Sequence, residues 1–198
     1  MDNTNKIIVA EFTTLDGVVG DPDGTWGEPG GGWALRQGPQ VFAGDKFRLG
    51  PIMHTGALLF GRGTWQVFAQ RWPGRTGDFP DAINKARKYV ASTTLTDADA
   101  WSNSTLLTGD LPAAVQQVRA DGDVVVIGSR GIAQQLAAAG LVDEYRLLVL
   151  PTVVGTGQRL FAAGQGDDLR LASADVIEAG VLLRYDVVRD SGDQQPNA

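Results

Sequence analysis

The chain has 198 residues, of which 43% are hydrophobic and 20% are charged, and its formal net charge is −6. This composition is typical of a globular domain and excludes a disordered or fibrous protein. There is no cysteine and only one histidine, His54, so we expect no disulfide, no metal site and no cysteine nucleophile. The acidic charge balance argues against a nucleic-acid partner.

The chain has no sign of a membrane or secretory segment. Every apolar stretch is shorter than the ~20 residues that cross a bilayer. The start, MDNTN, lacks the cationic and apolar regions of a secretory signal, so we expect a cytoplasmic protein. A chain of this length can bury roughly 70% of its unfolded surface in one core. We therefore expect a single domain over residues 1–189 and a disordered polar tail over residues 190–198.

The N-terminal part predicts a strand, a long loop and a helix. Residues 6–14 (KIIVAEFTT) indicate a buried strand that ends at an Asp-Gly turn. Residues 20–38 are rich in glycine and show no helical or strand periodicity of apolar residues, so they predict a long loop. Such loops often form part of a binding site. Pro39 is suited to the first turn of a helix, which we expect over residues 40–54.

Two middle segments repeat one pattern, in which a short apolar strand is followed by a glycine turn and a helix. The strand, turn and helix are residues 57–60, 61–64 and 65–69 in the first segment and residues 123–127, 128–131 and 132–139 in the second. Between them we expect a strand at residues 89–91 and a helix at residues 113–120, for which Asp110 is a suitable N-cap.

Consecutive strands are expected near the C-terminus. Residues 144–150 predict one strand, and residues 169–177 and 181–188 predict an antiparallel hairpin. Strands thus alternate with helices in the middle and follow one another at the end. The pattern indicates an α/β fold with a mixed, mostly parallel sheet, helices on both faces and a ligand at the carboxyl ends of the strands.

The two glycine turns share a design that suits a phosphate group. Each turn delivers the chain to a helix start, where unpaired N–H groups and about half a positive charge attract anions. Each also carries an arginine, Arg62 or Arg130, that can pair bidentately with phosphate oxygens. Neither turn matches a Walker A motif or the complete G-x-G-x-x-G fingerprint, which disfavours a kinase or an ordinary Rossmann dehydrogenase.

An ordered set of motifs resembles the dihydrofolate reductase superfamily. The motifs are TLDGVVG (residues 14–20), LLFGRGTW (58–65), YVASTTL (89–95) and VVIGSRGIAQQL (125–136). Residues 140–161 are also similar to the reductase domain of bifunctional riboflavin-biosynthesis deaminase-reductases and their stand-alone relatives. The resemblance covers nearly all of residues 6–189. It implies a dihydrofolate-reductase-like eight-stranded sheet, NADPH as hydride donor, a pterin or ribosylaminopyrimidine as acceptor, and a homodimer.

The resemblance also implies which residues contact the cofactor. They are Ala10, Val19, Gly20, Gly61, Arg62, Gly63, Thr64, Ser92, Thr93, Gly128, Ser129, Arg130, Gly131 and Ile132. Of these, Ser92 and Thr93 would lie beside the 2′-phosphate, and Ala10, Val19 and Gly20 would line the nicotinamide end. One departure is Ser129, because the superfamily usually has paired glycines there, which permit a very close approach of the backbone.

Hydride transfer to a C=N or C=O bond also requires a proton, and two acids are candidates for the donor. Asp45 is expected on the helix where dihydrofolate reductases keep the carboxylate that grips the pterin, although it also fits a helix cap. Asp16 belongs to the L-D-G element, although Asp-Gly is also an ordinary turn. In the long loop, Trp26 and Trp33 are expected either to stack on a flat substrate ring or the nicotinamide, or to pack in the core.

Three functions are consistent with these features. The first is an NADPH-dependent reductase of a small heterocyclic or ribosylated substrate. The second is an NADP(H)-binding protein without turnover, with a sensor or sequestering role, because no proton donor is unambiguous. The third is a true dihydrofolate reductase, which requires a carboxylate that grips the pterin. The zinc-dependent deaminase activity of the bifunctional relatives is excluded, because its zinc ligands are histidine and cysteine.

Overall fold

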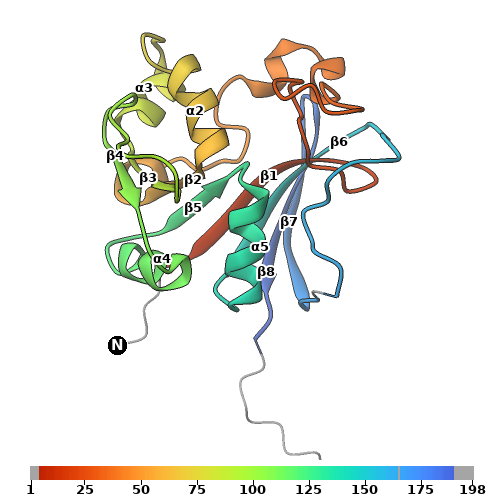
Figure 1. Ribbon diagram of the computed structural model, residues 1–198. Coiled ribbons are helices and arrows are strands. Elements are labelled where there is room, and N and C mark those ends of the chain that lie inside the picture. The colour runs from red at the N-terminus through yellow and green to blue at the C-terminus, as the bar shows by residue number, and fades with distance from the viewer. Residues whose placement is uncertain (1–4, 165, 190–198) are drawn as a thin grey trace, which may run out of the picture.

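The computed structural model describes residues 5–164 and 166–189, and the tail expected at residues 190–198 lies outside them. Its centre is an eight-stranded sheet with the order β4-β3-β2-β5-β1-β6-β8-β7 (Figure 1). The strands are β1 (Ile7–Thr14), β2 (Ala57–Gly61), β3 (Arg87–Ala91), β4 (Ser104–Leu107), β5 (Val124–Ile127), β6 (Glu144–Leu150), β7 (Leu169–Ile177) and β8 (Gly180–Val187). The helices are α1 (Ile52–Thr55), α2 (Arg62–Arg71), α3 (Asp78–Lys85), α4 (Leu111–Arg119) and α5 (Arg130–Ala138).

The sheet is mixed and mostly parallel, as predicted. Strands β4, β3, β2, β5, β1 and β6 run parallel to one another, and β8 runs antiparallel to both β6 and β7. The C-terminal hairpin is therefore confirmed. Because β2, β5 and β1 are neighbours, their carboxyl ends meet at one edge of the sheet, and the turns that follow β2 and β5 lie side by side.

Helices cover both faces of the sheet because each central strand is apolar on both sides. Alternate residues of β1 belong to different clusters: Ile8 packs in one and Ile7 in the other. The first cluster includes side chains of α1, α2 and α3, such as Met53, Trp65 and Ile83. The second cluster includes side chains of α4 and α5, such as Val115, Ile132 and Leu136. This arrangement buries near-continuous apolar strands, as a parallel sheet requires.

The helix predicted over residues 40–54 is wrong. The segment contains a 3₁₀ turn at Pro39–Phe42, an irregular stretch and the short helix α1. Gly44, Arg48 and Gly50 all have positive φ, which interrupts a right-handed helix. The Asp45 carboxylate accepts the backbone N–H groups of Leu49 and Gly50 at 2.8 and 2.7 Å, so it binds amides that a helix would have used.

Two further elements were not predicted, α3 and β4. Helix α3 has acidic residues, Asp78 and Asp81, in its first turn and Lys85 in its last, which suits the helix dipole. Strand β4 is the parallel edge of the sheet beside β3. The Asp110 cap is confirmed, since its side chain accepts the N–H of Ala113 at 2.9 Å. Among the described residues, no helix is long and apolar enough to cross a membrane.

Candidate functional site

The two glycine turns are tied together by the side chain of Ser129. Its hydroxyl accepts the N–H of Gly61 at 2.8 Å, contacts the Thr64 hydroxyl at 3.2 Å and donates to the Ile127 carbonyl at 3.0 Å. Thr64 in turn donates to the carbonyl of Gly128 at 3.1 Å. The serine that stands where a glycine was expected therefore fixes the start of α2 against the start of α5.

The starts of α2 and α5 present unpaired backbone N–H groups and Arg130 at one edge of the sheet. Neither helix has an acidic residue in its first turn or a side-chain hydrogen bond at its N-cap, so their unpaired N–H groups are not neutralised by the chain itself. Arg130 donates to Gln158 at 2.9 Å and to Gln134 at 3.1 Å. Because both partners are neutral amides, they orient the guanidinium and leave its positive charge available to an anion.

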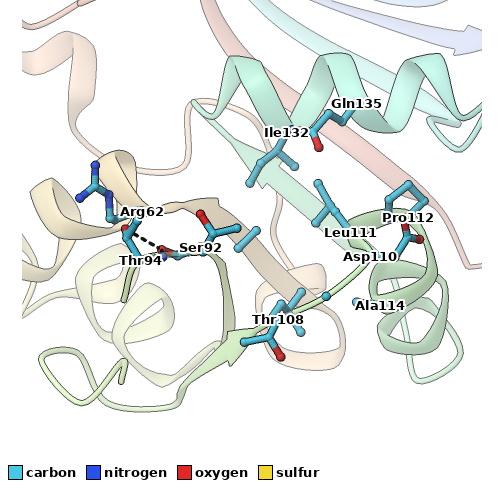
Figure 2. A pocket seen from close by; sticks show the side chains of 14 residues that line it. Arg62, Ser92, Thr94, Thr108, Asp110, Leu111, Pro112, Ala114, Ile132 and Gln135 are labelled. Atoms are coloured by element: carbon cyan, nitrogen blue, oxygen red, sulfur yellow. Dashed lines mark hydrogen bonds between the residues drawn. The ribbon is translucent and has the colours of Figure 1, made fainter. Parts of the chain in front are cut away.

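Two adjoining hollows lie along this edge. The outer hollow, of about 500 Å³, is lined by residues that include Arg62, Ser92, Thr93, Thr108 and Asp110 (Figure 2). The inner hollow, of about 380 Å³, is lined by Glu11, Val19, Gly20, Asp21, Pro22, Trp26, Glu28, Gly61, Gly63, Thr64, Gly128, Ser129, Arg130, Gly131, Ile132, Gln135 and Gln158. Ile132 and Gln135 of α5 line both, so the two hollows adjoin at α5 and together make up the groove at this edge.

The loop that follows β1 forms a wall of the inner hollow. The Asp21 carboxylate, which is 4% exposed, accepts the N–H groups of Trp26 and Glu28, each at 3.0 Å. Glu28 in turn accepts from the Gln158 amide at 2.8 Å. The Trp26 ring lies over the start of α2, since a Cβ added at Gly63 would be 3.2 Å from it. The long glycine-rich loop is thus held against the groove, as expected of a loop that serves a site.

Most residues assigned to cofactor binding do line the groove. Arg62, Ser92 and Thr93 line the outer hollow, and the inner hollow contains the other predicted residues except Ala10. Ala10 is fully buried in the sheet, and only its carbonyl points toward the turn, where it accepts the N–H of Gly128 at 3.2 Å. The structure thus brings both predicted turns and the Val19–Gly20 element to one groove.

Three other predicted residues lie outside the groove. Trp33 is fully buried and donates its indole N–H to the Gly20 carbonyl at 2.8 Å, so it supports the loop from behind. Asp45 is bound to two backbone amides on the irregular stretch before α1. Asp16 accepts from the Thr14 hydroxyl and from two backbone N–H groups, and these bonds lower its pKa to about 2. These positions favour structural roles for all three.

The structure adds a carboxyl group that the sequence reading did not single out, Glu11 on β1. Glu11 is 4% exposed, lines the inner hollow and lies close to Gly128 and Arg130. Burial raises the pKa of Glu11 to about 8, against the opposing effects of the Gly128 N–H and the Arg130 charge. The sequence did contain a signal for this residue. Glu11 lies on the same face of the strand as Ile7 and Val9, so it is an acid on a buried face near the carboxyl end of the strand.

Comparisons with known proteins agree with the fold. A family model described as the RibD C-terminal domain matches residues 5–183. An uncharacterised protein of Bacillus subtilis strain 168, YyaP, is 24% identical over 135 residues, which is 63% of this chain and 70% of YyaP. A Shewanella sp. PV-4 structure assigned to riboflavin biosynthesis has a TM-score of 0.71 at 19% identity, covering 93% of this chain and 99% of its own.

Two further solved structures connect the fold to reductases. Enterococcus faecalis dihydrofolate reductase, complexed with NADP(H), has a TM-score of 0.56 at 13% identity, and the match covers 92% of this chain and 96% of that one. A Thermotoga maritima deaminase and 5-amino-6-(5-phosphoribosylamino)uracil reductase has a TM-score of 0.59 at 14% identity. That match covers 93% of this chain and 57% of the Thermotoga chain. At these identities the likeness shows the dihydrofolate-reductase-like fold.

Proposed function

The chain belongs to the RibD C-terminal domain family, and we propose that it is an NADPH-dependent reductase of a small heterocyclic or ribosylaminopyrimidine-like substrate. One observation carries the proposal: two helix starts without acidic caps, each with an arginine, line two hollows that adjoin at α5. The solved structures of similar fold include a reductase complexed with NADP(H) and a pyrimidine reductase, which supports the same cofactor and substrate class.

The two hollows offer hydrogen-bond donors and an arginine each to the phosphate groups of a dinucleotide. The inner hollow offers the N-terminal amides of α2 and α5 and the Arg130 guanidinium to a diphosphate. The outer hollow offers the Arg62 guanidinium and the hydroxyls of Ser92 and Thr93 to the additional phosphate of NADPH. Gly128 has a φ of 57°, a conformation that glycine adopts without strain, and its lack of a side chain leaves room for the ligand beside Glu11.

Side chains at the inner end would orient the reacting ring and exclude water. NADPH, when bound, supplies the hydride from its nicotinamide ring. Val19 is an apolar lining residue at this end, and Trp26 is 55% exposed and offers an aromatic face at the rim. We propose that Trp26 stacks on the nicotinamide or on a flat substrate ring, which leaves Trp33 as its buried support.

The proposal is tested by titrating the protein with NADPH and with NADH while following tryptophan fluorescence. We expect saturable quenching by NADPH and weaker binding of NADH, because only NADPH carries a phosphate for the outer hollow. Arg62→Gln should reduce the preference for NADPH about tenfold and leave the affinity for NADH unchanged. Arg75→Gln is the matched control, because Arg75 lies over the Trp72 ring and lines neither hollow. No saturable response to either nucleotide would refute the proposal.

A panel of acceptors distinguishes the three candidate functions. Oxidation of NADPH with an aminopyrimidine ribosyl phosphate or another imine or carbonyl acceptor supports the reductase. Tight binding of NADPH without turnover of any acceptor supports the sensor or sequestering protein. Turnover of dihydrofolate supports a true dihydrofolate reductase, which the position of Asp45 does not favour, since its carboxylate is occupied by two backbone amides.

A further inference from the structure

The proposed reaction consumes a proton, and the inner hollow contains three carboxyl groups that can be compared as its source. Asp21 is bound by two backbone N–H groups and Glu28 by the Gln158 amide, so both are held as hydrogen-bond acceptors. No described side chain forms a hydrogen bond or ion pair with Glu11. Its contacts are the Gly128 N–H and the nearby charge of Arg130. Among the three acids of the hollow, Glu11 is therefore the one whose carboxyl group is least occupied by hydrogen bonds that stabilise the fold.

The position of Glu11 follows from the register of the sheet. Ala10 pairs with Ile127, the last residue of β5, so Glu11 is level with Gly128, where the turn into α5 begins. A Cβ added at Gly128 would lie 4.0 Å from a carboxylate oxygen of Glu11. The side chain therefore points along the sheet face toward the start of α5, at the floor of the inner hollow.

The surroundings of Glu11 contain little opposite charge. On β6 its partner is the apolar Leu147, and the last residue of β5 is the apolar Ile127. Thr64 on α2 is neutral and lines the same hollow. The charged groups that face this hollow are Arg130 from α5 and the two carboxylates of the loop after β1, Asp21 and Glu28. Burial thus disfavours the carboxylate form of Glu11, and only the Gly128 N–H and the Arg130 charge oppose that effect.

We propose, on the basis of the reductase function above, that the Glu11 carboxylic acid is the proton donor of the reduction. As the hydride forms a C–H bond at the carbon of a C=N or C=O group, the π electron pair moves to the nitrogen or oxygen. That atom takes the proton from Glu11, so an N–H or O–H bond forms while the O–H bond of the acid breaks. NADPH is oxidised to NADP⁺, the substrate is reduced by two electrons, and Glu11 regains a proton from solvent.

The same surroundings explain how Glu11 can release its proton and then recover it. The carboxylate left behind lies beside the Gly128 N–H and the positive charge of Arg130, both of which lower the pKa of Glu11. In the proposed complex the nicotinamide ring would lie at the Val19 end of the same hollow, where NADP⁺ would bring a positive charge toward Glu11 and the neutral ring of NADPH would not. Because an opposite charge within about 4–6 Å lowers a carboxyl pKa by roughly 1–3 units, the oxidised cofactor favours ionised Glu11 and the reduced cofactor does not.

This difference gives a test that requires no substrate. The dissociation constants of NADP⁺ and NADPH are measured by calorimetry from pH 6.5 to 9.5, and their ratio is followed. We expect the affinity for NADP⁺ relative to NADPH to rise at least about tenfold over this range, since the shift in the Glu11 pKa is at least about one unit. The ribose phosphate is common to both nucleotides, so its titration cancels in the ratio.

Two variants locate the effect. Glu11→Gln should abolish the pH dependence of the ratio while still binding both nucleotides. Glu28→Gln, which removes a carboxylate from the same hollow, should preserve it. Failure of wild-type protein to bind either nucleotide would refute the proposed function itself. Binding of both nucleotides with a ratio that is constant with pH, or that changes equally in Glu11→Gln, would refute the role of Glu11 and leave the proposed function standing.

Discussion

Two buried glutamates on neighbouring strands, Glu11 of β1 and Glu144 of β6, show opposite solutions to the burial of a carboxyl group. They lie on opposite faces of the sheet. Glu144 pairs with Ile8, which belongs to the first cluster, whereas Glu11 shares a face of β1 with Ile7, which belongs to the second. Both are nearly inaccessible to solvent: Glu11 is 4% exposed and Glu144 is 1% exposed. They differ in their partners.

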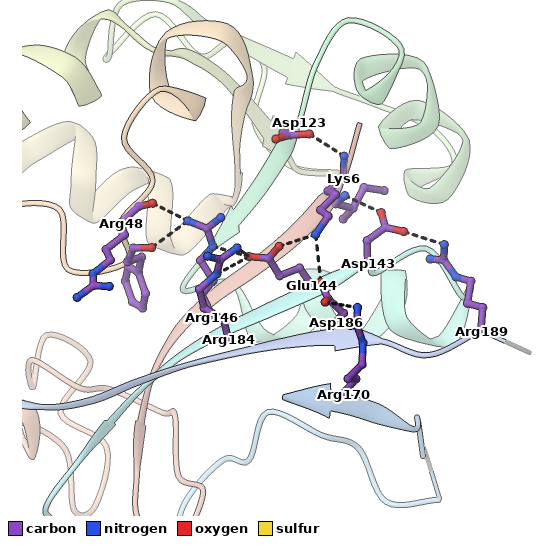
Figure 3. Close-up of polar contacts among 12 residues, drawn as sticks. Lys6, Arg48, Asp123, Asp143, Glu144, Arg146, Arg170, Arg184, Asp186 and Arg189 are labelled. Carbon is purple, nitrogen blue, oxygen red and sulfur yellow. Dashed lines mark hydrogen bonds and ion pairs between the residues drawn. The ribbon is translucent and has the colours of Figure 1, made fainter. Parts of the chain in front are cut away.

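Glu144 is the centre of an ion-pair network (Figure 3). It pairs with Lys6 at 2.8 Å, Arg146 at 2.7 Å and Arg184 at 3.2 Å. Burial alone would raise the pKa of Glu144, but the bonds from Lys6 and Arg146 outweigh it and lower the pKa to about 2. Arg146 also donates to the carbonyls of Phe47 and Arg48, so the network fastens the irregular stretch before α1 to the sheet.

The contrast separates a carboxylate that stabilises the fold from a carboxylic acid that is available for chemistry. A buried glutamate surrounded by cations remains ionised and cannot easily give or take a proton. A buried glutamate without such a partner retains its proton at neutral pH, which is the property expected of a general acid.

The largest effect is expected from Glu144→Gln. The change removes the partner of Arg146, whose side chain is only 6% exposed, and it should lower the free energy of unfolding by roughly 3–5 kcal/mol at pH 7. Because the folded-state pKa of Glu144 is lowered, the contribution of Glu144 to the free energy of unfolding is present above pH 4.5 and is lost as the pH falls toward 2. Urea unfolding at several pH values measures the loss of stability and its pH dependence. A decrease in the free energy of unfolding below about 1 kcal/mol at pH 7 would contradict the account.

The opposite sign is expected for Glu11→Gln. The folded-state pKa of Glu11 is raised, so the free energy of unfolding falls as the pH rises from 4.5 to about 8, where the unfolded chain has lost the Glu11 proton and the folded protein still holds it. The variant should resemble wild type near pH 4 and be more stable by up to about 5 kcal/mol at pH 9. Thermal or urea unfolding at both pH values tests this expectation. A variant that is equally stable or less stable at pH 9 would show that Glu11 has a stabilising partner.

A smaller effect is expected from Ser129→Ala, which removes the link between the two turns. The Gly61 N–H loses its acceptor, so the free energy of unfolding should fall by about 1–2 kcal/mol and nucleotide affinity should weaken as the two helix starts separate. Ser173→Ala on β7 is the control, because within the described part of the chain its hydroxyl bonds only to Asp175, and it should change stability by less than about 0.5 kcal/mol. Equal effects of the two changes would contradict a special role for Ser129.

The smallest effect is expected at the exposed edge of the Glu144 network. Arg170, whose side chain is 72% exposed, pairs with Asp186 at 2.8 Å. Arg170→Ala should lower the free energy of unfolding by at most about 0.5 kcal/mol, and the loss should diminish in high salt. A loss comparable with that of Glu144→Gln would mean that the network is not centred on the buried glutamate.

Much of the fold could be predicted from the sequence because its strands are short, apolar and bounded by glycine. Residues 57–60 and 123–127 met these conditions, and their strands were found within one residue of the expected bounds. The helix at residues 40–54 failed because the apolar spacing competes with local features. The positive φ of Arg48 and the amide bonds to Asp45 depend on tertiary packing, which periodicity does not report.

The candidate site was only partly predictable, for a related reason. Glycine turns at strand ends are local features, so both could be located and placed at one edge of the sheet. The state of an acid depends on what surrounds it in three dimensions. Asp16 and Asp45 had suitable motif positions but are bound by backbone amides, whereas Glu11 was concealed within an apolar strand. The homodimer stays a prediction.

The central claim is that Glu11 is protonated at neutral pH, and it can be measured directly. The chain has only four glutamates, so protein labelled with ¹³C at the glutamate side-chain carboxyl gives a simple NMR spectrum. We predict that the signal absent from Glu11→Gln titrates with a midpoint near pH 8 and that this midpoint falls when NADP⁺ binds. A Glu11 signal that titrates fully below pH 6 would contradict the account.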